Sequence, residues 1–112
     1  MRMWMIDPKK MCRKHLLGEH VETHMFRGTI LKKAHLKGYV KNNCIELKKL
    51  KERHEELARE IERRGYKHNS EFIEDYDISY LEENEINSKV DIERASVDLK
   101  GRCEECKKLH EN

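Results

Sequence analysis

The spacing of apolar residues is the feature that most constrains this chain, because apolar side chains recur at three- and four-residue steps over two long stretches. The first stretch contains Met11, Leu17, Val21, Met25, Gly28, Leu31 and Ala34, and the second contains Leu47, Leu50, His54, Leu57 and Ile61. This period places each set on one face of an α-helix. Charged residues make up 41% of the chain and aromatic residues only 6%, which favours solvated helices over a β-sandwich. We therefore expect an all-α fold, with one domain spanning residues 1–112.

Cap and stop residues give the expected limits of the helices. Asp7, followed by the only proline, is typical of a helix start, and Gly38 of a helix end, so the first helix is expected between them. The second helix should end just before Gly65, and a third should begin near Ser88. Residues 66–87 follow no sustained period. We expect one compact domain of three main helices, with an irregular connector between the second and the third.

Charge is distributed unevenly along the chain. Residues 1–69 contain 18 Lys and Arg against 9 Asp and Glu, a net charge of +9, whereas residues 70–112 contain 6 against 13, a net charge of −7. A basic surface of this kind attracts nucleic acid, and it can equally pair with the acidic part of its own chain. The charge pattern alone leaves both interpretations open.

The chain has no stretch near the roughly 20 apolar residues that a membrane span needs. Its first residues are interrupted too early by Asp7 and Pro8 to form a signal peptide. We therefore expect a cytoplasmic protein without a membrane partner, a monomer, whose four cysteines are reduced.

Cysteine and histidine spacing raises the question of a metal. Cys103, Cys106 and His110 share the face of one expected helix, and Cys12 and His15 could add two further ligands. The same spacing is also that of a buried stripe in which a free cysteine behaves as a small apolar residue. Because no second CxxC pair exists, the expectation is no metal and no cofactor, and a small zinc-binding structural protein is kept as an alternative.

Ionisable groups on the first helix suggest chemistry. Glu22 has Gly18 one turn before it, so its carboxylate could lie in a partly desolvated pocket that raises its pKa toward general acid or base use. The bulky Arg2 should prevent removal of Met1, so the chain is expected to begin with the α-amine of Met1. An α-amine, with an ordinary pKa of about 7.7 to 8.0, is partly neutral at neutral pH and can form a Schiff base with a sugar aldehyde.

These residues resemble the pyrimidine-dimer DNA glycosylases of the phage endonuclease V type. The similarity rests on Arg2 directly after the terminal residue, on the pattern from His15 and Leu16 through Glu19 to Glu22, and on Gly28 six residues later. A second block, residues 47–66 with its basic end, resembles the second long helix of that family. Together the two blocks cover roughly the first 66 residues.

The resemblance implies an activity and assigns roles. In that family the N-terminal α-amine attacks C1′ of the damaged nucleotide, the base leaves as a Schiff base forms, and the strand is cut by β-elimination. A glutamate of the first helix acts as acid and base, and an arginine contacts DNA near the lesion. By position these roles fall on Met1, Glu22 and Arg2. The implied function is repair of UV-induced cyclobutane pyrimidine dimers in double-stranded DNA, with associated abasic-site lyase activity.

The chain also departs from the phage pattern. Two family arginines beside the catalytic glutamate are replaced by Val21 and Met25, the terminal threonine by Met1, and the aromatic basic tail is missing. The residues expected to contact DNA are Arg2, Arg13, Lys14, His20, His24, Arg27 and Lys33. A non-catalytic DNA-binding module with the same basic residues is the second alternative.

Overall fold

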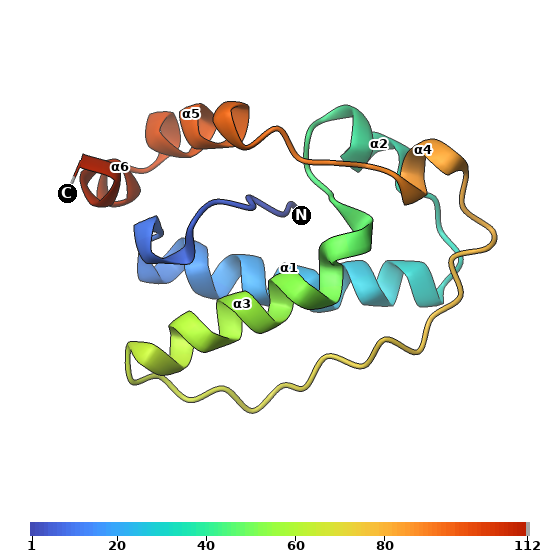
Figure 1. Cartoon of the computed structure of the whole chain (residues 1–112), viewed down its shortest axis with the longest axis horizontal. Coiled ribbons are helices and arrows are strands. Elements are labelled where there is room, and N and C mark those ends of the chain that lie inside the picture. The colour runs from blue at the N-terminus through green and yellow to red at the C-terminus, as the bar shows by residue number, and fades with distance from the viewer. Residues whose placement is uncertain (112) are drawn as a thin grey trace.

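The computed structural model describes residues 1–111, and within them every regular element is helical (Figure 1). Four helices are long enough to shape the molecule: α1 (Arg13–Leu31), α3 (Leu50–Arg63), α5 (Ile92–Arg102) and α6 (Glu104–Glu111). The shorter elements are α2 (Lys37–Lys41), α4 (Glu83–Ile86) and two 3-10 turns (Pro8–Lys10 and Leu47–Lys49). The all-α expectation is confirmed, but the count of three main helices is corrected to four. The expected third helix is divided because Cys103 is extended, with φ of −136°.

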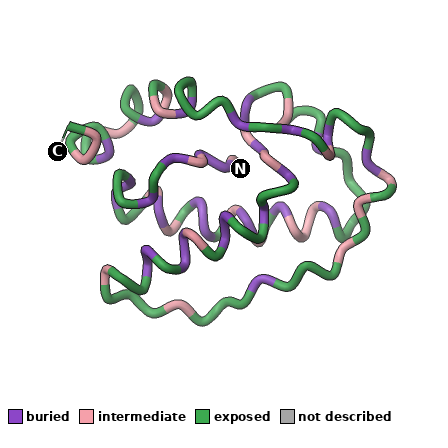
Figure 2. Tube along the Cα trace, in the orientation of Figure 1, coloured by how far each residue is buried: buried purple, intermediate pink, exposed green. Residues whose placement is uncertain are grey.

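The N-terminal segment lies between two groups of helices. In Figure 1 the helices α1 and α3 pack across each other in the lower half, and α5, α6, α2 and α4 follow the upper half. The chain begins in the middle, between these groups, and Figure 2 shows buried residues along this segment and along α1 and α3. Met3, Trp4 and Ile6 are buried and join two apolar clusters, one at each end of the molecule. The first residues of the chain are therefore part of the core.

The first long helix is shorter than expected at both ends. Asp7 accepts a hydrogen bond from the backbone N–H of Lys9 (3.0 Å), so it caps the 3-10 turn and not α1. The helix ends at Leu31, shortly before Lys33 adopts the left-handed conformation with φ of +61°. Gly38 lies inside α2 and does not stop the first helix. The expected limits at Asp7 and Gly38 were wrong because local turns intervene at both ends.

The buried face of α1 is not the one that the apolar stripe indicates. Val21, Met25 and Leu31 are 54%, 49% and 44% exposed. The face that packs on α3 and the N-terminal segment instead carries Leu16, Glu19, His20, Thr23, Phe26 and Ile30. Polar side chains can be buried here because α3 supplies partners for them, Arg53 to Glu19 and His54 to His20.

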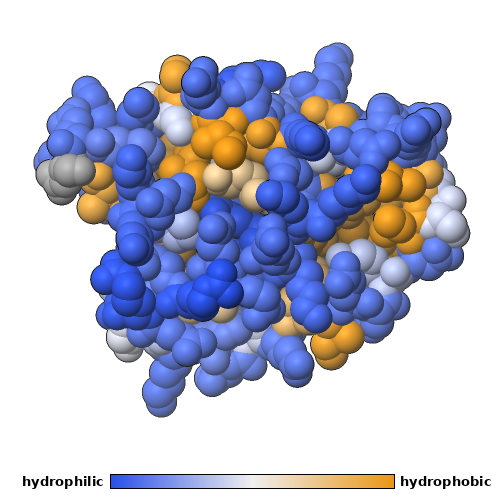
Figure 3. Space-filling view, viewed as in Figure 1, coloured by the Kyte–Doolittle hydropathy of each residue, from blue (hydrophilic) through white to orange (hydrophobic). Residues whose placement is uncertain are grey.

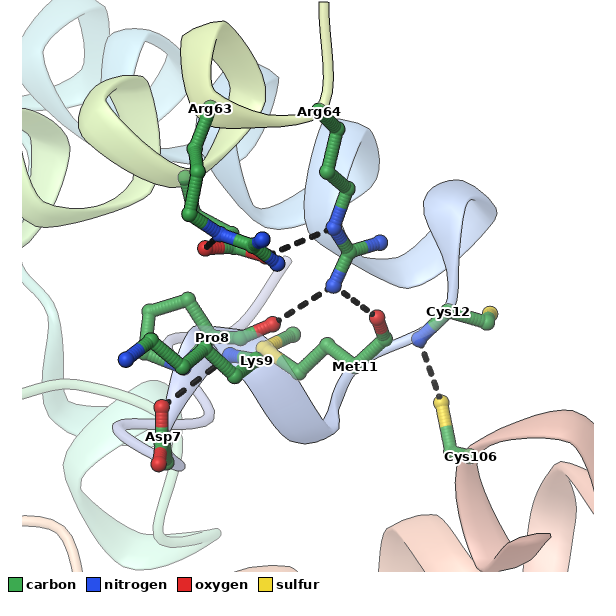
Figure 4. Close-up of polar contacts among 9 residues, drawn as sticks. Asp7, Pro8, Lys9, Met11, Cys12, Arg63, Arg64 and Cys106 are labelled. Atoms are coloured by element: carbon green, nitrogen blue, oxygen red, sulfur yellow. Dashed lines mark hydrogen bonds and ion pairs between the residues drawn. The ribbon is translucent and has the colours of Figure 1, made fainter. Parts of the chain in front are cut away.

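The second long helix ends as the sequence predicts. Arg64 caps α3, and Gly65 follows with φ of +88°, a conformation that glycine adopts without steric cost. The guanidinium of Arg64 donates to the carbonyl oxygens of Pro8 (2.9 Å) and Met11 (2.7 Å), as Figure 4 shows. The end of α3 therefore fixes the turn that leads into α1.

The connector between α3 and α5 is extended, apart from α4, and runs along the outside of the molecule (Figure 1). Three ion pairs attach its acidic residues to basic residues of the first part of the chain: Arg27–Asp75, Lys33–Asp77 and Lys37–Glu82. Part of the basic surface is thus paired within the chain itself. Hydrophilic side chains cover most of the face in Figure 3, and no helix among the described residues is both long and apolar enough to span a bilayer.

Candidate active site

An open cleft of about 590 Å³ lies beside the N-terminus. Its walls come from four parts of the chain: the first residues, one side of α1 from Lys14 to Glu22, the turn after α2 with Asn42 and Cys44, and the side of α5 that carries Arg94 and Asp98. Clefts of roughly 300 to 1,000 Å³ are the usual size for sites that bind a small molecule or a single nucleotide. Both residues expected to perform chemistry, Met1 and Glu22, line this cleft.

The terminus is held in place by the residues that follow it. The backbone N–H of Met3 donates to the carbonyl oxygen of Cys44 (2.6 Å), and Met3 and Trp4 are buried. Arg2 stacks on the Trp4 ring, with its guanidinium carbon 3.7 Å from the ring centroid, and lies 3.7 Å from an oxygen of Asp98. These contacts anchor the residues that follow Met1, so Met1 is held at the cleft.

Arg2 has unused hydrogen-bonding capacity. Its Nε and Nη2 atoms are buried and have no partner among the described residues. Buried donors of a charged group without a partner are costly, so they mark a place where an anion is favourable. The guanidinium lies beside the cleft, next to the terminus.

Glu22 has the electrostatic setting that the sequence predicts. It is half-buried, and desolvation raises the pKa of its carboxyl above the ordinary value. The positive charge of the terminus and the backbone N–H of Arg2 act in the opposite direction, which shows that both lie near the carboxylate. One turn earlier, a Cβ added at Gly18 would meet nothing within 4 Å, so the space beside Glu22 is open.

A buried ion pair supports the helix surface that carries Glu22. Glu19 is 1% exposed and Arg53 2% exposed. The Arg53 guanidinium donates from Nε to Oε2 of Glu19 (2.6 Å) and from Nη2 to Oε1 (2.9 Å), a two-pronged geometry that is strong and directional. This pair joins α1 to α3 one turn before Glu22 and so fixes the rotation of α1.

A family model for pyrimidine dimer DNA glycosylases matches residues 1–74, which contain the N-terminal segment, α1 and α3. The chain belongs to the pyrimidine dimer DNA glycosylase family. No curated protein and no solved structure matches the chain. Membership of a DNA glycosylase family implies DNA as the substrate. The match stops before α4, α5 and α6, so the α5 wall of the cleft lies outside the part that resembles the family.

The DNA-contacting residues expected for this glycosylase-family chain do not all gather at the cleft. Lys14 and Arg2 line it. Arg13 stacks on the ring of Tyr66, with its guanidinium carbon 4.8 Å from the centroid. Arg27 donates to the carbonyl oxygen of Ile73 (2.7 Å) and to Asp75 (2.7 Å), and Lys33 pairs with Asp77 (3.4 Å).

His20 and His24 face α3 and the connector in a cluster of four imidazoles with His54 and His68. The Nε2 atom of His20 lies 3.1 Å from that of His54 and 2.8 Å from that of His68. Burial and the neighbouring imidazoles lower the pKa of His20 to about 4. The rings of His20 and His24 meet edge to face, with their centroids 5.1 Å apart. These two histidines are therefore packed inside the fold and do not line the cleft.

The sequence reasoning missed the α5 wall of the cleft. Arg94, Asp98 and Arg102 line the cleft from α5. They recur at four-residue steps, so the spacing that places side chains on one helix face could have grouped them. Nothing in the spacing alone, however, indicates that this face lies opposite Glu22.

Three further groups of side chains among the described residues have donor atoms close enough to surround one metal ion, one of them the partly exposed set of His35, Glu82 and Glu85. Of the other two, the first consists of Cys12, His15, Cys103 and Cys106, and the second of His20, His54 and His68; within each group the donor atoms lie within 4.8 Å of one another. His110 belongs to none of them, because its Nδ1 atom is bonded to the carbonyl oxygen of Cys106 (2.7 Å).

Proposed function

We propose that this protein excises cyclobutane pyrimidine dimers from double-stranded DNA and cuts the strand as an abasic-site lyase. The nucleophile is the α-amine of Met1, and Glu22 acts as acid and base. One observation supports this most strongly: the terminus and Glu22 line the same open cleft, each positioned by buried neighbours.

The chemistry requires a neutral amine beside a carboxyl group. The amine nitrogen attacks C1′ of the damaged nucleotide, and the bond from C1′ to the base breaks with its electrons leaving on the base. The Met1 nitrogen then loses a proton, the C1′–O4′ bond breaks as O4′ takes up a proton, and the opened sugar carries an iminium between C1′ and that nitrogen. Glu22, as a carboxylate, removes a proton from C2′, and β-elimination expels the 3′ phosphate. The raised pKa of Glu22 suits a group that must both give and accept protons near neutral pH.

The charges around the cleft suit a phosphate backbone. Arg2, Lys14, Arg94 and Arg102 line it, against the carboxylates of Glu22 and of Asp98, which pairs with Arg2. The unused donors of Arg2 can be satisfied by a phosphate oxygen next to the damaged nucleotide. Extruding a damaged base costs only a few kcal/mol, and the cleft is large enough to receive the sugar beside Glu22.

The remaining contacts stay predictions. Arg13, His20, His24, Arg27 and Lys33 are expected to contact DNA from the family resemblance, yet in this structure they are engaged elsewhere in the chain. To contact DNA, Arg27 would have to leave its ion pair with Asp75, or Lys33 its ion pair with Asp77, and pair with a phosphate instead. Such an exchange depends strongly on salt concentration.

The test is incision of a duplex that carries a single cyclobutane thymine dimer. We expect cutting by the native chain and a loss of about 10²- to 10⁴-fold in Glu22→Gln, with DNA affinity retained. Glu93→Gln is the matched control, because Glu93 is exposed on α5 and does not line the cleft. Addition of one residue before Met1 should abolish cutting while the circular dichroism spectrum stays unchanged.

Two outcomes would refute the proposal. Unchanged turnover in Glu22→Gln would remove that residue from the mechanism. Salt-dependent DNA binding by the native chain without any cutting, of dimers or of abasic sites, would instead support the non-catalytic DNA-binding module.

A further inference from the structure

Four metal-ligating side chains meet at the junction of α1 with α5 and α6, and one of them, His15, also lines the cleft. Cys12 immediately precedes α1 and His15 lies in its first turn; Cys103 separates α5 from α6, and Cys106 lies in the first turn of α6. Cys12 and Cys106 are buried, and His15 and Cys103 are partly buried. Two short Cys-x2 pairs, 91 residues apart in the chain, thus face each other.

The distances among the donor atoms are those of a tetrahedral site. The Sγ atoms of Cys12 and Cys103 are 3.8 Å apart, and Nδ1 of His15 lies 3.7 Å from Sγ of Cys106 and 3.2 Å from Sγ of Cys12. Around a tetrahedral zinc ion, with Zn–S of about 2.3 Å and Zn–N of about 2.0 Å, neighbouring ligand atoms lie roughly 3.5 to 3.8 Å apart. The first two distances fall in this range, the third is shorter, and all four donor atoms lie within 4.8 Å of one another, so they can surround one ion.

Backbone groups also point at the sulfur atoms. The N–H of Cys12 donates to Sγ of Cys106 (3.2 Å, drawn in Figure 4), and the N–H of Cys106 donates to Sγ of Cys103 (3.5 Å). Hydrogen bonds from backbone N–H groups favour negatively charged sulfur, the form in which cysteine binds a metal. Outer contacts of this kind orient ligands in protein metal sites.

The other arrangements of these cysteines fit less well. A disulfide would need sulfur atoms about 2.0 Å apart, and it would leave the third cysteine and the histidine unexplained. An iron–sulfur cluster divides its ligands among two or more irons, and ligands on different irons lie farther apart than the donor atoms here. A cluster of neutral thiols would pack as small apolar side chains and would not require the imidazole of His15 among them.

We propose that Cys12, His15, Cys103 and Cys106 bind one zinc ion. Three thiolates and one imidazole form a closed set of four ligands, which is typical of a structural zinc site with no position left for a substrate. The ion would join α5 and α6 to the start of α1. Because α5 forms a wall of the cleft, zinc would stabilise the site without taking part in the reaction.

The experiment is metal analysis of the purified full chain, followed by titration of the metal-free protein with Zn²⁺. We expect about one zinc per chain, and loss of tight binding in Cys103→Ser and His15→Ala. The loss should exceed the roughly 10- to 100-fold that follows removal of an outer contact. Cys44→Ser is the matched control, because Cys44 bonds to the carbonyl oxygen of Asn42 and is not part of the cluster; it should keep its zinc.

A second substitution separates ligation from misfolding. His15→Cys supplies a thiolate in place of the imidazole, so it should recover zinc binding that His15→Ala loses. Co²⁺ in place of zinc should give the visible absorption bands of a tetrahedral thiolate site in the native chain and in Cys44→Ser.

Each contrary result overturns the site. If the metal-free chain does not take up Zn²⁺, or if Cys103→Ser retains the metal, these residues are not the ligands; the second case would point to His20, His54 and His68. Iron with acid-labile sulfide would show a cluster in place of zinc. None of these measurements involves DNA, so failure of the zinc site can be distinguished from failure of the proposed function.

Discussion

Removal of the Arg53 guanidinium should destabilise the fold strongly. Arg53→Met keeps most of the side-chain volume but deletes both hydrogen bonds to Glu19. The Glu19 carboxylate is 1% exposed, so water cannot replace the lost partner. Breaking a buried ion pair from one side costs about 3–5 kcal/mol, most of it from the charge left behind. We expect a loss of that size in the free energy of unfolding.

The double variant Arg53→Met with Glu19→Gln identifies the cause. A neutral amide is far cheaper to bury than an unpaired carboxylate, so the second substitution should restore most of the lost stability. The assay is urea unfolding of the native chain, the two single variants and the double variant at pH 7. All four curves are fitted with one common slope of the free energy of unfolding against urea concentration. A loss below about 1 kcal/mol in Arg53→Met, or a double variant no more stable than Arg53→Met, would refute the reasoning from burial.

Three further predictions concern acid stability, the open side of the cleft and the pH dependence of the reaction. Hydrogen bonds from Arg63 and Arg64 lower the pKa of Glu60 from 4.5 to about 2, so the stability that this carboxylate contributes is complete above pH 4.5 and is lost as the pH falls toward 2. Glu60→Gln should remove this contribution to the pH dependence of the free energy of unfolding, measured by urea unfolding at pH 7 and pH 3. Gly18→Ala should raise the melting temperature, with a gain of up to about 1 kcal/mol, because a Cβ there meets nothing, whereas Gly18→Phe should fill the space beside Glu22 and lower kcat/KM for cutting. The acidic limb of the pH–rate profile should have its midpoint above the ordinary value of 4.5, because burial raises the pKa of Glu22; a midpoint at or below that value would contradict its role as base.

Local signals in the sequence predicted some elements well. The second long helix follows from its apolar period and from Gly65, and both are local properties of the backbone. The irregular connector follows from the loss of period after Tyr66. Asp91 caps α5 by accepting from the N–H of Arg94 (3.1 Å), three residues later than the expected start at Ser88.

The buried face of α1 could not be predicted from its own residues. Glu19 and His20 are buried because Arg53 and His54, more than thirty positions later, are placed against them. Apolar period alone therefore selected the exposed side, with Val21 and Met25. Contacts with α3, which the sequence of α1 alone does not encode, determine which face of α1 is buried.

The residues of the candidate sites also differ in whether the sequence alone could identify them. Met1 and Glu22 could be named as candidates in advance because a terminal amine and a helical carboxylate are recognisable by type and position, and the family resemblance assigned their roles. The expectation of no metal rested on the absence of a second CxxC pair. Only the folded chain brings Cys12 and His15 within ligand distance of Cys103 and Cys106.

The most direct test of the central claim is borohydride trapping on a duplex that contains one abasic site, followed by mass spectrometry of the trapped peptide. We expect a covalent adduct on the α-nitrogen of Met1, absent when one residue is added before it. An adduct on a lysine such as Lys14, or no adduct in a sample that binds the duplex, would contradict that claim.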